Sequence, residues 1–566
     1  NNTFTGTITT GTAGNTGYGF GMASISDVSG VGGINLGIVT SGGTFRWLGA
    51  SGVTQTLANR QFALSGTTGT SVISALGANA VDNLVINQNL LITGTGAKTL
   101  TLAGANTGAN TFAGNIADGA GSVITVAKTQ AGTWALGGTN TYTGITNLLA
   151  SGTTGRLIFQ GAQSLSSSTT IAFNQNSSFV QSISLLDDSV DTIDFARPIT
   201  FAGANTTQHM NIFVGNNNTA NGGSSSGTTT GSTIQVGDIT WNNAAQAANT
   251  TRTFNVTGAN GYRLETGNFI LPNLSTRTSG QNFTNAFNPT TAPLTIGGTI
   301  TMASGNNVSG GIPILNLAGT AVGNEVVGAI SDAADVGTTL RPVNLTKTST
   351  STWTLSGNNT YTGTTTISGG TLLINGDSSA ATGAVTVSGN GTTLGGDGII
   401  GGAVTFTTGT SFLSPGNSPG QLTMPSLALG ASTTTTMELG GTTLGTLYDN
   451  ITINMDGTLG YAGFLDVVNF GAFDMDVGSF TYDLFSFSGT TSPTGNFGSV
   501  TVNSIGLTND GFGVWTASNG PSVDYTFTQS TGDLIVSVVP EPGTLALLAA
   551  GSLLGLGILR RRRKAA

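Results

Sequence analysis

Side chains that could do acid–base or metal chemistry are scarce in this chain. Its 566 residues include one histidine, His209, and no cysteine. A Ser-His-Asp triad or a histidine-bound metal would have to use His209, whose surroundings, FAGANTTQHMNIFVGNNN, hold no acid and no nucleophile motif. Without cysteine, neither a disulfide framework nor a thiolate metal site can form. We therefore expect His209 to be a surface or corner residue with no catalytic role.

The densest acidic run is SLLDDSVDTIDF, residues 184–195. Its carboxylates belong to Asp187, Asp188, Asp191 and Asp194. Oxygen ligands at such spacing could hold calcium, but the run is neither an EF-hand loop nor the glycine-aspartate nonapeptide of calcium-binding β-rolls. A solvated acidic loop is the favoured interpretation, calcium is a weak alternative, and no cofactor is expected.

The charge balance argues against nucleic acid as a partner. Only 7% of the residues are charged, against about 25% in an average soluble protein. Five of the 16 basic residues lie in 560–564, which leaves 11 bases against 25 acids elsewhere. Phosphate binding needs clustered Lys and Arg. Because the chain starts at Asn1 and not at Met, we expect that a signal peptide has been removed or that the sequence is a fragment.

The same scarcity weighs against catalysis. Polysaccharide-active enzymes need carboxylates that converge on one bond, and no acid–base cluster is visible. Acids on distant parts of the chain could still meet in the fold, so a polysaccharide-active enzyme remains an alternative to a non-enzymatic protein.

Short alternating segments dominate the chain before residue 540. Examples are AVTVSG, TLLING and DLIVSVV, each bounded by Gly, Asn or Asp. Alternation places one set of side chains inward and the other outward. The 26 Phe residues and 37% apolar content indicate a folded chain, since disordered chains lack such residues. Frequent short strands predict an all-β sandwich, barrel or solenoid.

Internal repetition favours the solenoid. KTQAGTWALGGTNTYTGIT (128–146) and KTSTSTWTLSGNNTYTGTT (347–365) keep the same spacing from Lys to Trp and from Trp to Tyr. The likeness extends upstream, to LTLAGANTGANTFAGNIAD from Leu100 and LNLAGTAVGNEVVGAISD from Leu315. Stacked coils of this kind bury a continuous core, and we expect turns of roughly 20–25 residues. Trp134 and Trp353 are expected in that core, with sugar stacking as the alternative.

These two segments resemble the autotransporter-associated β-strand repeat, a strand followed by a Gly-Asn-x-Tyr-x-Gly corner. The resemblance implies a right-handed parallel β-helix exposed outside the cell. We place this β-helix at 1–404, with clear repeats near 100–146 and 315–376. Residues 160–310 match the repeat poorly and are expected to be decorated or irregular.

From Thr405 the sequence becomes richer in Phe, as in VVNFGAFDMDVGSFTYDLFSFSG. We interpret 405–537 as a compact β-rich domain that caps the coil, because an open β-helix end exposes unpaired backbone groups.

The C-terminal segment 538–566 differs from everything before it. Pro540, Glu541 and Pro542 end the last strand signal. Thr544 to Leu559 carry no charge, and as a helix they would be about 24 Å long, slightly short of a bilayer core. A basic block follows and would remain in the cytoplasm: Arg560, Arg561, Arg562, Arg563 and Lys564. A single C-terminal hydrophobic helix in the inner membrane is therefore expected.

This tail resembles the PEP-CTERM sorting signal. The resemblance implies an exosortase-type enzyme as partner, Pro540, Glu541 and Pro542 as substrate residues, and cleavage near them. The expected protein is non-enzymatic, exported, tethered transiently to the inner membrane, and then delivered to the cell surface or extracellular matrix, with exopolysaccharide as a further partner. A glycan-binding adhesin is the alternative.

Overall fold

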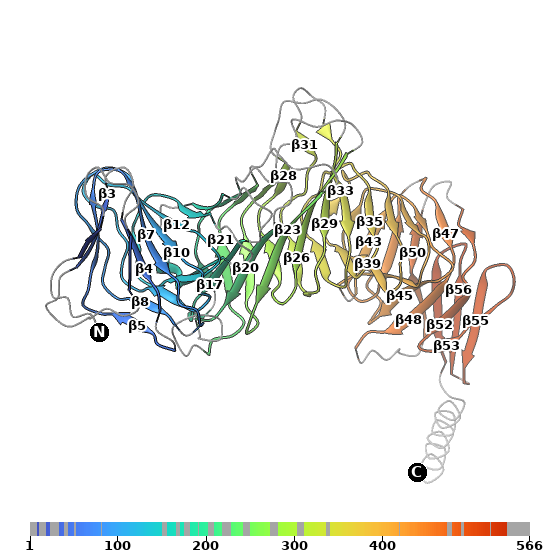
Figure 1. Cartoon of the computed structure of the whole chain (residues 1–566). Coiled ribbons are helices and arrows are strands. Elements are labelled where there is room, and N and C mark those ends of the chain that lie inside the picture. Colours follow the sequence, from blue (N-terminus) through green and yellow to red (C-terminus); the bar gives the residue numbers. More distant parts are fainter. Residues whose placement is uncertain are drawn as a thin grey trace, which may run out of the picture. The chain divides into compact units, whose positions relative to one another are not determined.

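A computed structural model gives the fold of this chain (Figure 1). The structure describes residues 8–10, 19–22, 33–38, 43–49, 52–80, 82–149, 155–165, 170–174, 181–190, 192–201, 209–217, 228–241, 250–271, 281–302, 311–334, 340–417, 419–454, 456–471, 478–487, 492–520 and 522–539. The chain forms two compact units, Asn1–Gly357 (unit 1) and Asn358–Ala566 (unit 2). Each unit is described by itself.

The strands follow the alternation of the sequence. In β45 (Thr433–Leu439), every second side chain is buried and those between are half-buried. Glycines permit the corners between strands: Gly389 and Gly391, which link β38 (Val385–Val387) to β39 (Thr392–Gly396), have φ of 90° and 71°. One set of side chains therefore fills the core, and the chain can turn within a few residues.

Unit 1 consists mainly of four parallel sheets. Sheet A contains β1 (Ile8–Thr10), β3 (Ile34–Ile38), β6 (Phe62–Gly66) and β9 (Leu91–Ile92). Sheet B contains β2 (Gly19–Met22), β4 (Thr44–Trp47), β7 (Gly69–Ala75), β10 (Lys98–Ala103), β12 (Ile124–Lys128), β14 (Thr146–Leu148), β16 (Ile171–Phe173), β19 (Ile199–Phe201), β22 (Ile239–Trp241), β25 (Phe269–Leu271) and β28 (Ile300–Met302). Sheet C contains β5 (Gln55–Leu57), β8 (Leu84–Ile86), β11 (Asn110–Phe112), β13 (Thr133–Leu136), β15 (Arg156–Gln160), β17 (Gln181–Leu186), β20 (His209–Gly215), β23 (Thr250–Gly258), β26 (Gln281–Pro289), β29 (Gly311–Leu317) and β33 (Asn344–Lys347). Sheet D contains β18 (Thr192–Asp194), β21 (Thr233–Val236), β24 (Arg263–Thr266), β27 (Leu294–Ile296), β30 (Asn324–Val326) and β34 (Thr352–Leu355). A small antiparallel pair joins β31 (Ala333–Ala334) to β32 (Leu340–Arg341).

Successive turns of unit 1 visit these sheets in order, which is the topology of a parallel β-helix. The first turns pass through sheets A, B and C, the turns from β12 to β17 use only B and C, and sheet D joins from β18 onward. The predicted all-β parallel β-helix is therefore confirmed. The predicted turn length holds only locally: 20 residues separate the paired Val126 and Thr146, but 40 separate Ile199 and Ile239. Longer connections between the strands account for the difference.

An aromatic column fills the core where an irregular stretch was expected. Phe173 stacks on Phe201, and the ring centroids of Phe201 and Trp241 lie 5.1 Å apart. Phe269 contacts both Trp241 and Phe287. The described residues of 160–310 thus continue the parallel stack. The expectation of an irregular stretch was wrong for them, whereas the 40 residues between the paired Ile199 and Ile239 fit the alternative of a decorated stretch.

Unit 2 contains three parallel sheets and one antiparallel sheet. Sheet E contains β35 (Thr365–Ile367), β38, β41 (Val404–Phe406), β44 (Leu427–Ala428), β47 (Leu459–Tyr461) and β51 (Thr494–Gly495). Sheet F contains β36 (Thr371–Ile374), β39, β42 (Ser411–Pro415), β45, β48 (Phe464–Asn469) and β52 (Ser499–Val502), with β53 (Ile505–Gly506) antiparallel to β52. Sheet G contains β37 (Asp377–Ser378), β40 (Ile399–Ile400), β43 (Gln421–Met424), β46 (Asn450–Ile453) and β50 (Phe485–Phe487). The antiparallel sheet H has the order β49 (Gly478–Asp483), β57 (Asp533–Val538), β56 (Val523–Thr528), β55 (Val514–Asn519) and β54 (Thr508–Asn509).

The parallel register of unit 2 passes through the domain boundary that the sequence predicts after residue 404. Val385 pairs with Val404, and Val404 pairs with Leu427, so this boundary falls inside β41. A separate domain at 405–537 stays a prediction. The antiparallel sheet H, which begins at Gly478, is the part of that segment whose topology differs from the stack.

The predicted membrane segment, Thr544 to Leu559, lies outside the described residues. Within the described ranges, the helical element is the short 3₁₀ turn η1 (Ala162–Ser164). No helix in this part of the chain has the length and apolar character needed to cross a membrane.

Candidate functional site

The repeat tryptophans belong to the core. Trp134 lies in β13 and Trp353 in β34, and neither side chain is exposed to solvent. Each indole N–H donates a hydrogen bond to a backbone carbonyl, Trp134 to Ala103 at 2.8 Å and Trp353 to Ala318 at 3.0 Å. The core prediction is confirmed, and sugar stacking on these two rings is wrong, because a fully buried ring offers no face to a glycan.

A buried asparagine pairs in register with each tryptophan. Asn110 lies opposite Trp134, and Asn324 lies opposite Trp353. The Asn110 amide accepts a hydrogen bond from the backbone N–H of Leu84 at 3.0 Å and donates one to a backbone carbonyl of the Trp134 strand at 2.9 Å. Asn324 makes the same two kinds of bond at 3.0 and 2.9 Å. Each amide joins consecutive turns, so the repeat extends one turn upstream, as the sequence predicts.

The repeat lysines are buried at the ends of their strands. The Lys128 ammonium donates to the carbonyls of Thr129 and Gln130 at 2.7 and 2.8 Å, and Lys347 makes the equivalent two bonds at 2.8 and 3.0 Å. The second acceptor residue is left-handed in both copies, with φ of 59° at Gln130 and 61° at Ser349. Each lysine therefore satisfies the carbonyls of a corner that ordinary L residues rarely adopt.

Burial shifts the proton affinity of both amines. Desolvation lowers the pKa of Lys128 to about 7 and that of Lys347 to about 8. The sequence did not predict these corner lysines, although the constant Lys-to-Trp spacing of the two repeats was the signal that could have revealed them.

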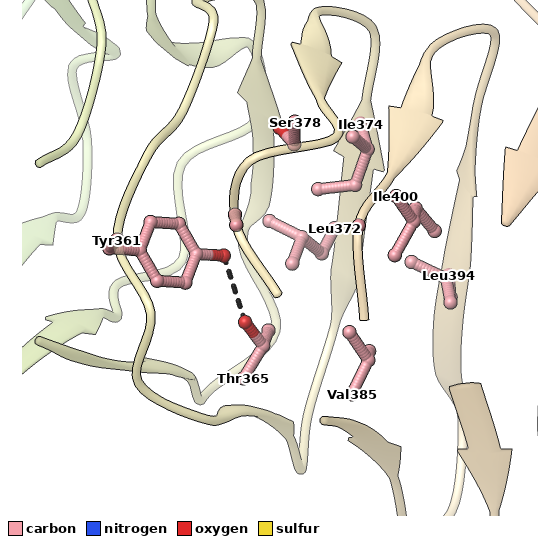
Figure 2. A pocket seen from close by; sticks show the side chains of 10 residues that line it. Tyr361, Thr365, Leu372, Ile374, Ser378, Val385, Leu394 and Ile400 are labelled. Atoms are coloured by element: carbon pink, nitrogen blue, oxygen red, sulfur yellow. Dashed lines mark hydrogen bonds between the residues drawn. The ribbon is translucent and has the colours of Figure 1, made fainter. Parts of the chain in front are cut away.

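The tyrosine corner of the repeat is also internal. The hydroxyls of Tyr142 and Thr146 lie 2.6 Å apart, and those of Tyr361 and Thr365 lie 2.8 Å apart (Figure 2). Burial raises the pKa of Tyr142 and raises that of Tyr361 to about 12. Both phenols therefore remain neutral and act as hydrogen-bonding parts of the fold.

A small cavity lies beside Tyr361 in unit 2. Figure 2 shows Tyr361, Leu372, Val385 and Leu394 around it, and all four are buried. Its volume of about 10 Å³ is at the lower limit for one water molecule. This cavity is therefore too small to hold a substrate.

The candidate catalytic and metal residues lie outside the two repeat segments of the sequence. His209 begins β20, where it is half-buried and pairs in register with Thr253. The Asp187 carboxylate accepts hydrogen bonds from the backbone N–H groups of Ala162 and Ser189 at 2.9 and 2.8 Å. Its local role is to satisfy the backbone beyond the end of β17.

The remaining acids of the calcium candidate do not form a described cluster. Asp188 accepts a hydrogen bond from the backbone N–H of Asn217 at 2.8 Å, Asp194 is exposed in β18, and Asp191 lies outside the described residues. Across the ranges that the structure describes, no three His, Cys, Asp or Glu side chains are grouped to hold a metal ion.

A ladder of amides covers part of the outer face of sheet C. Asn255 donates to the Asn211 side chain at 2.8 Å, and Asn288 donates to Asn255 at 2.6 Å. The three residues are neighbours in register on β20, β23 and β26. These three positions form a polar, uncharged row linked by hydrogen bonds.

The predicted sorting residues begin where the described chain ends. β57 ends at Val538, and the Val539 N–H donates to the Ser522 carbonyl at 2.8 Å. Pro540, Glu541 and Pro542, the apolar segment 544–559 and the basic residues 560–564 lie outside the described residues.

Comparison with known proteins identifies two kinds of segment. Residues 126–153 and 345–374 match the Passenger-associated-transport-repeat. Residues 538–564 match the PEP-CTERM protein-sorting motif.

A segment of 128 residues is 38% identical to a protein named Adhesin BmaC autotransporter from Brucella suis biovar 1 (strain 1330). The match covers 23% of this chain and 4% of that protein. The chain therefore carries two autotransporter-associated passenger repeats within a parallel β-helix and a PEP-CTERM protein-sorting motif at its C-terminal end.

Proposed function

We propose that this chain is a non-enzymatic β-helix protein of the cell surface or extracellular matrix. In this proposal it is exported, held transiently in the inner membrane by residues 544–559, and then cut near Pro540–Pro542 by an exosortase-type enzyme. The observation that carries the proposal is the position of the sorting motif, which starts within the last residues of β57. A processing site there separates the tail from a completed fold.

The repeat region supports a scaffold role at the surface. Its Trp and Asn side chains make internal hydrogen bonds between turns, and its Lys and Tyr side chains make internal hydrogen bonds within a corner. The similar protein from Brucella suis is named as an autotransporter adhesin, which favours adhesion or spacing over catalysis. In the described residues the carboxylates of Asp187 and Asp188 accept backbone N–H groups, which is a structural use.

Cell fractionation combined with mass determination tests the proposal. We expect the wild-type chain in the surface or extracellular fraction to lack the segment from the Pro540 region to Ala566. Glu541→Gln is expected to accumulate in the membrane fraction with Ala566 intact, because it alters the sorting motif. Asp524→Asn removes one exposed acid from β56 and serves as the matched control, with wild-type processing expected. Extracellular protein that still ends at Ala566 would contradict the proposal.

A further inference from the structure

Two phenylalanines stand exposed in one row on the outer face of sheet F. Phe412 is 40% exposed and Phe464 is 42% exposed. Phe412 pairs in register with Thr434, and Thr434 pairs with Phe464 (β45 and β48 in Figure 1). The two rings therefore project from the same face with one threonine strand between them.

The strand spacing fixes the distance between the rings. Neighbouring strands lie about 4.8 Å apart, so side chains two strands apart in one row are roughly 10 Å apart. This is about the length of two pyranose rings in an extended polysaccharide. A phenyl face packs against the C–H face of a sugar ring, and the hydroxyls of Thr434 and the adjacent Ser499 continue the same row.

Polar groups flank this apolar row. Asp466 lies two residues beyond Phe464 on the same face of β48, and its carboxylate accepts a hydrogen bond from the Thr501 hydroxyl at 2.6 Å. Carboxylates and hydroxyls of this kind can accept hydrogen bonds from sugar hydroxyls.

The charge of the surrounding sequence selects among polysaccharides. Residues 358–539 contain 12 Asp or Glu and no Lys, Arg or His. An acidic polysaccharide would approach a surface of its own sign without a cation to pair with. An uncharged polymer escapes this repulsion, whereas its hydroxyls can still donate to carboxylates.

We infer that the row Phe412–Thr434–Phe464 binds an extended, uncharged polysaccharide whose chain runs across the strands of sheet F. Alternate sugar rings stack on Phe412 and Phe464, and the intervening ring lies over Thr434. This inference rests on the proposed function, since it names the polymer with which a surface protein of this kind would associate.

Sedimentation of the full chain with an insoluble β-1,4-glucan, cellulose, tests the inference. Alginate, an acidic polysaccharide, is the charged comparison. We expect the wild-type chain to be retained on cellulose and to show no measurable binding to alginate beads. Phe412→Ala and Phe464→Ala are each expected to weaken retention on the order of tenfold, which is the effect of losing a central aromatic contact.

Phe512→Ala is the matched control, because Phe512 is 92% exposed and lies outside the row. It should bind cellulose like the wild type. The inference would be overturned if the wild type did not bind cellulose, or if it bound alginate equally well. It would also be overturned if the Phe412→Ala, Phe464→Ala double variant bound cellulose like the wild type. Loss of a self-associated state in the double variant, measured by its mass in solution, would overturn it as well. The surface location of the double variant, measured in cells that produce it, tests the proposed function separately from polysaccharide binding. The double variant leaves residues 538–566 unchanged, so it should still reach the surface.

Discussion

Units 1 and 2 build parallel β-helical turns from sequences with different charge compositions. Residues 1–357 contain 11 Lys or Arg and 12 Asp or Glu, whereas residues 358–559 contain 13 acids and no Lys, Arg or His. Unit 1 buries several of its bases completely, among them Arg60, Lys128 and Lys347. Unit 1 also buries the acids Asp82, Asp187 and Asp332, whereas in the described part of unit 2 the buried charged residue is the acid Asp449.

Buried lysines donate to corner carbonyls in unit 1, which also uses hydroxyl donors such as Ser122 and Ser351. In unit 1 the ammonium groups of Lys128 and Lys347 donate to corner carbonyls. In unit 2 the Thr392 hydroxyl donates to the Ser388 carbonyl at 2.9 Å, and the hydroxyls of Ser411 and Thr433 lie 3.0 Å apart. A stacked coil needs a donor at each buried corner carbonyl, and both a desolvated amine and a row of small hydroxyls meet that need.

The largest expected effect tests whether the units are stabilised separately. Trp134→Ala should destabilise unit 1 by about 3–5 kcal/mol, because it removes a fully buried indole and leaves a cavity. Hydrogen exchange followed by mass spectrometry should show faster exchange in unit 1 peptides and unchanged exchange in those of unit 2. Trp134→Phe is the control and should lose less stability than Trp134→Ala, since an aromatic ring still fills most of the space. Equal loss of protection in both units would break the comparison.

The pH dependence of stability should have opposite signs in the two units. Burial raises the pKa of Asp449 to about 7, and the nearby Glu438 charge adds a smaller increase. Hydrogen bonds from the backbone N–H groups of Gly420 and Glu438 to the Asp449 carboxylate oppose this increase. The folded state therefore binds a proton more tightly than the unfolded state does. The contribution is fully present below pH 4 and is lost as the pH rises through 7, and the loss between pH 5 and 9 is about 3 kcal/mol.

Lys128 gives the reverse dependence in unit 1. Its folded pKa of about 7 lies below the ordinary value of 10.5, so the unfolded state binds the proton more tightly. This contribution is present above pH 10.5 and is lost as the pH falls through 7, and the loss between pH 9 and 5 is again about 3 kcal/mol. Hydrogen exchange between pH 5 and 9, corrected for the intrinsic exchange rates, measures how the stability of each unit changes with pH. Asp449→Asn and Lys128→Met should each flatten the slope of their own unit, and slopes of the same sign in the wild type would contradict the comparison.

The smallest expected effect concerns the left-handed corner of the second repeat. Ser349 is exposed and has φ of 61°. Ser349→Gly relieves the strain of this conformation but makes the unfolded chain more flexible, so we expect a stabilisation below about 1 kcal/mol. Thermal unfolding measures it. Thr350→Gly, at the neighbouring exposed position, is the control and should give no stabilisation.

The sequence predicted the parts of the fold that depend on local pattern. Trp134, Trp353 and the Tyr corners could be placed because identical spacing in two segments requires identical turns. The change from two to three sheets per turn could not be predicted, since it depends on which strands pair across connections as long as that between Ile199 and Ile239. Buried lysines were missed because lysine is ordinarily a surface residue, and its burial here depends on corner carbonyls that only the folded backbone brings together.

The position of β57 has a mechanical consequence. β57 lies between β49 and β56, and each of its six residues has a register partner on both neighbours. The sorting motif continues directly from its C-terminal end. Tension applied along β57 through the tail would load these hydrogen bonds together, in shear, and not one after another as in unzipping. Sheet H is therefore built to resist pulling at the one end of the strand to which the sorting signal is attached.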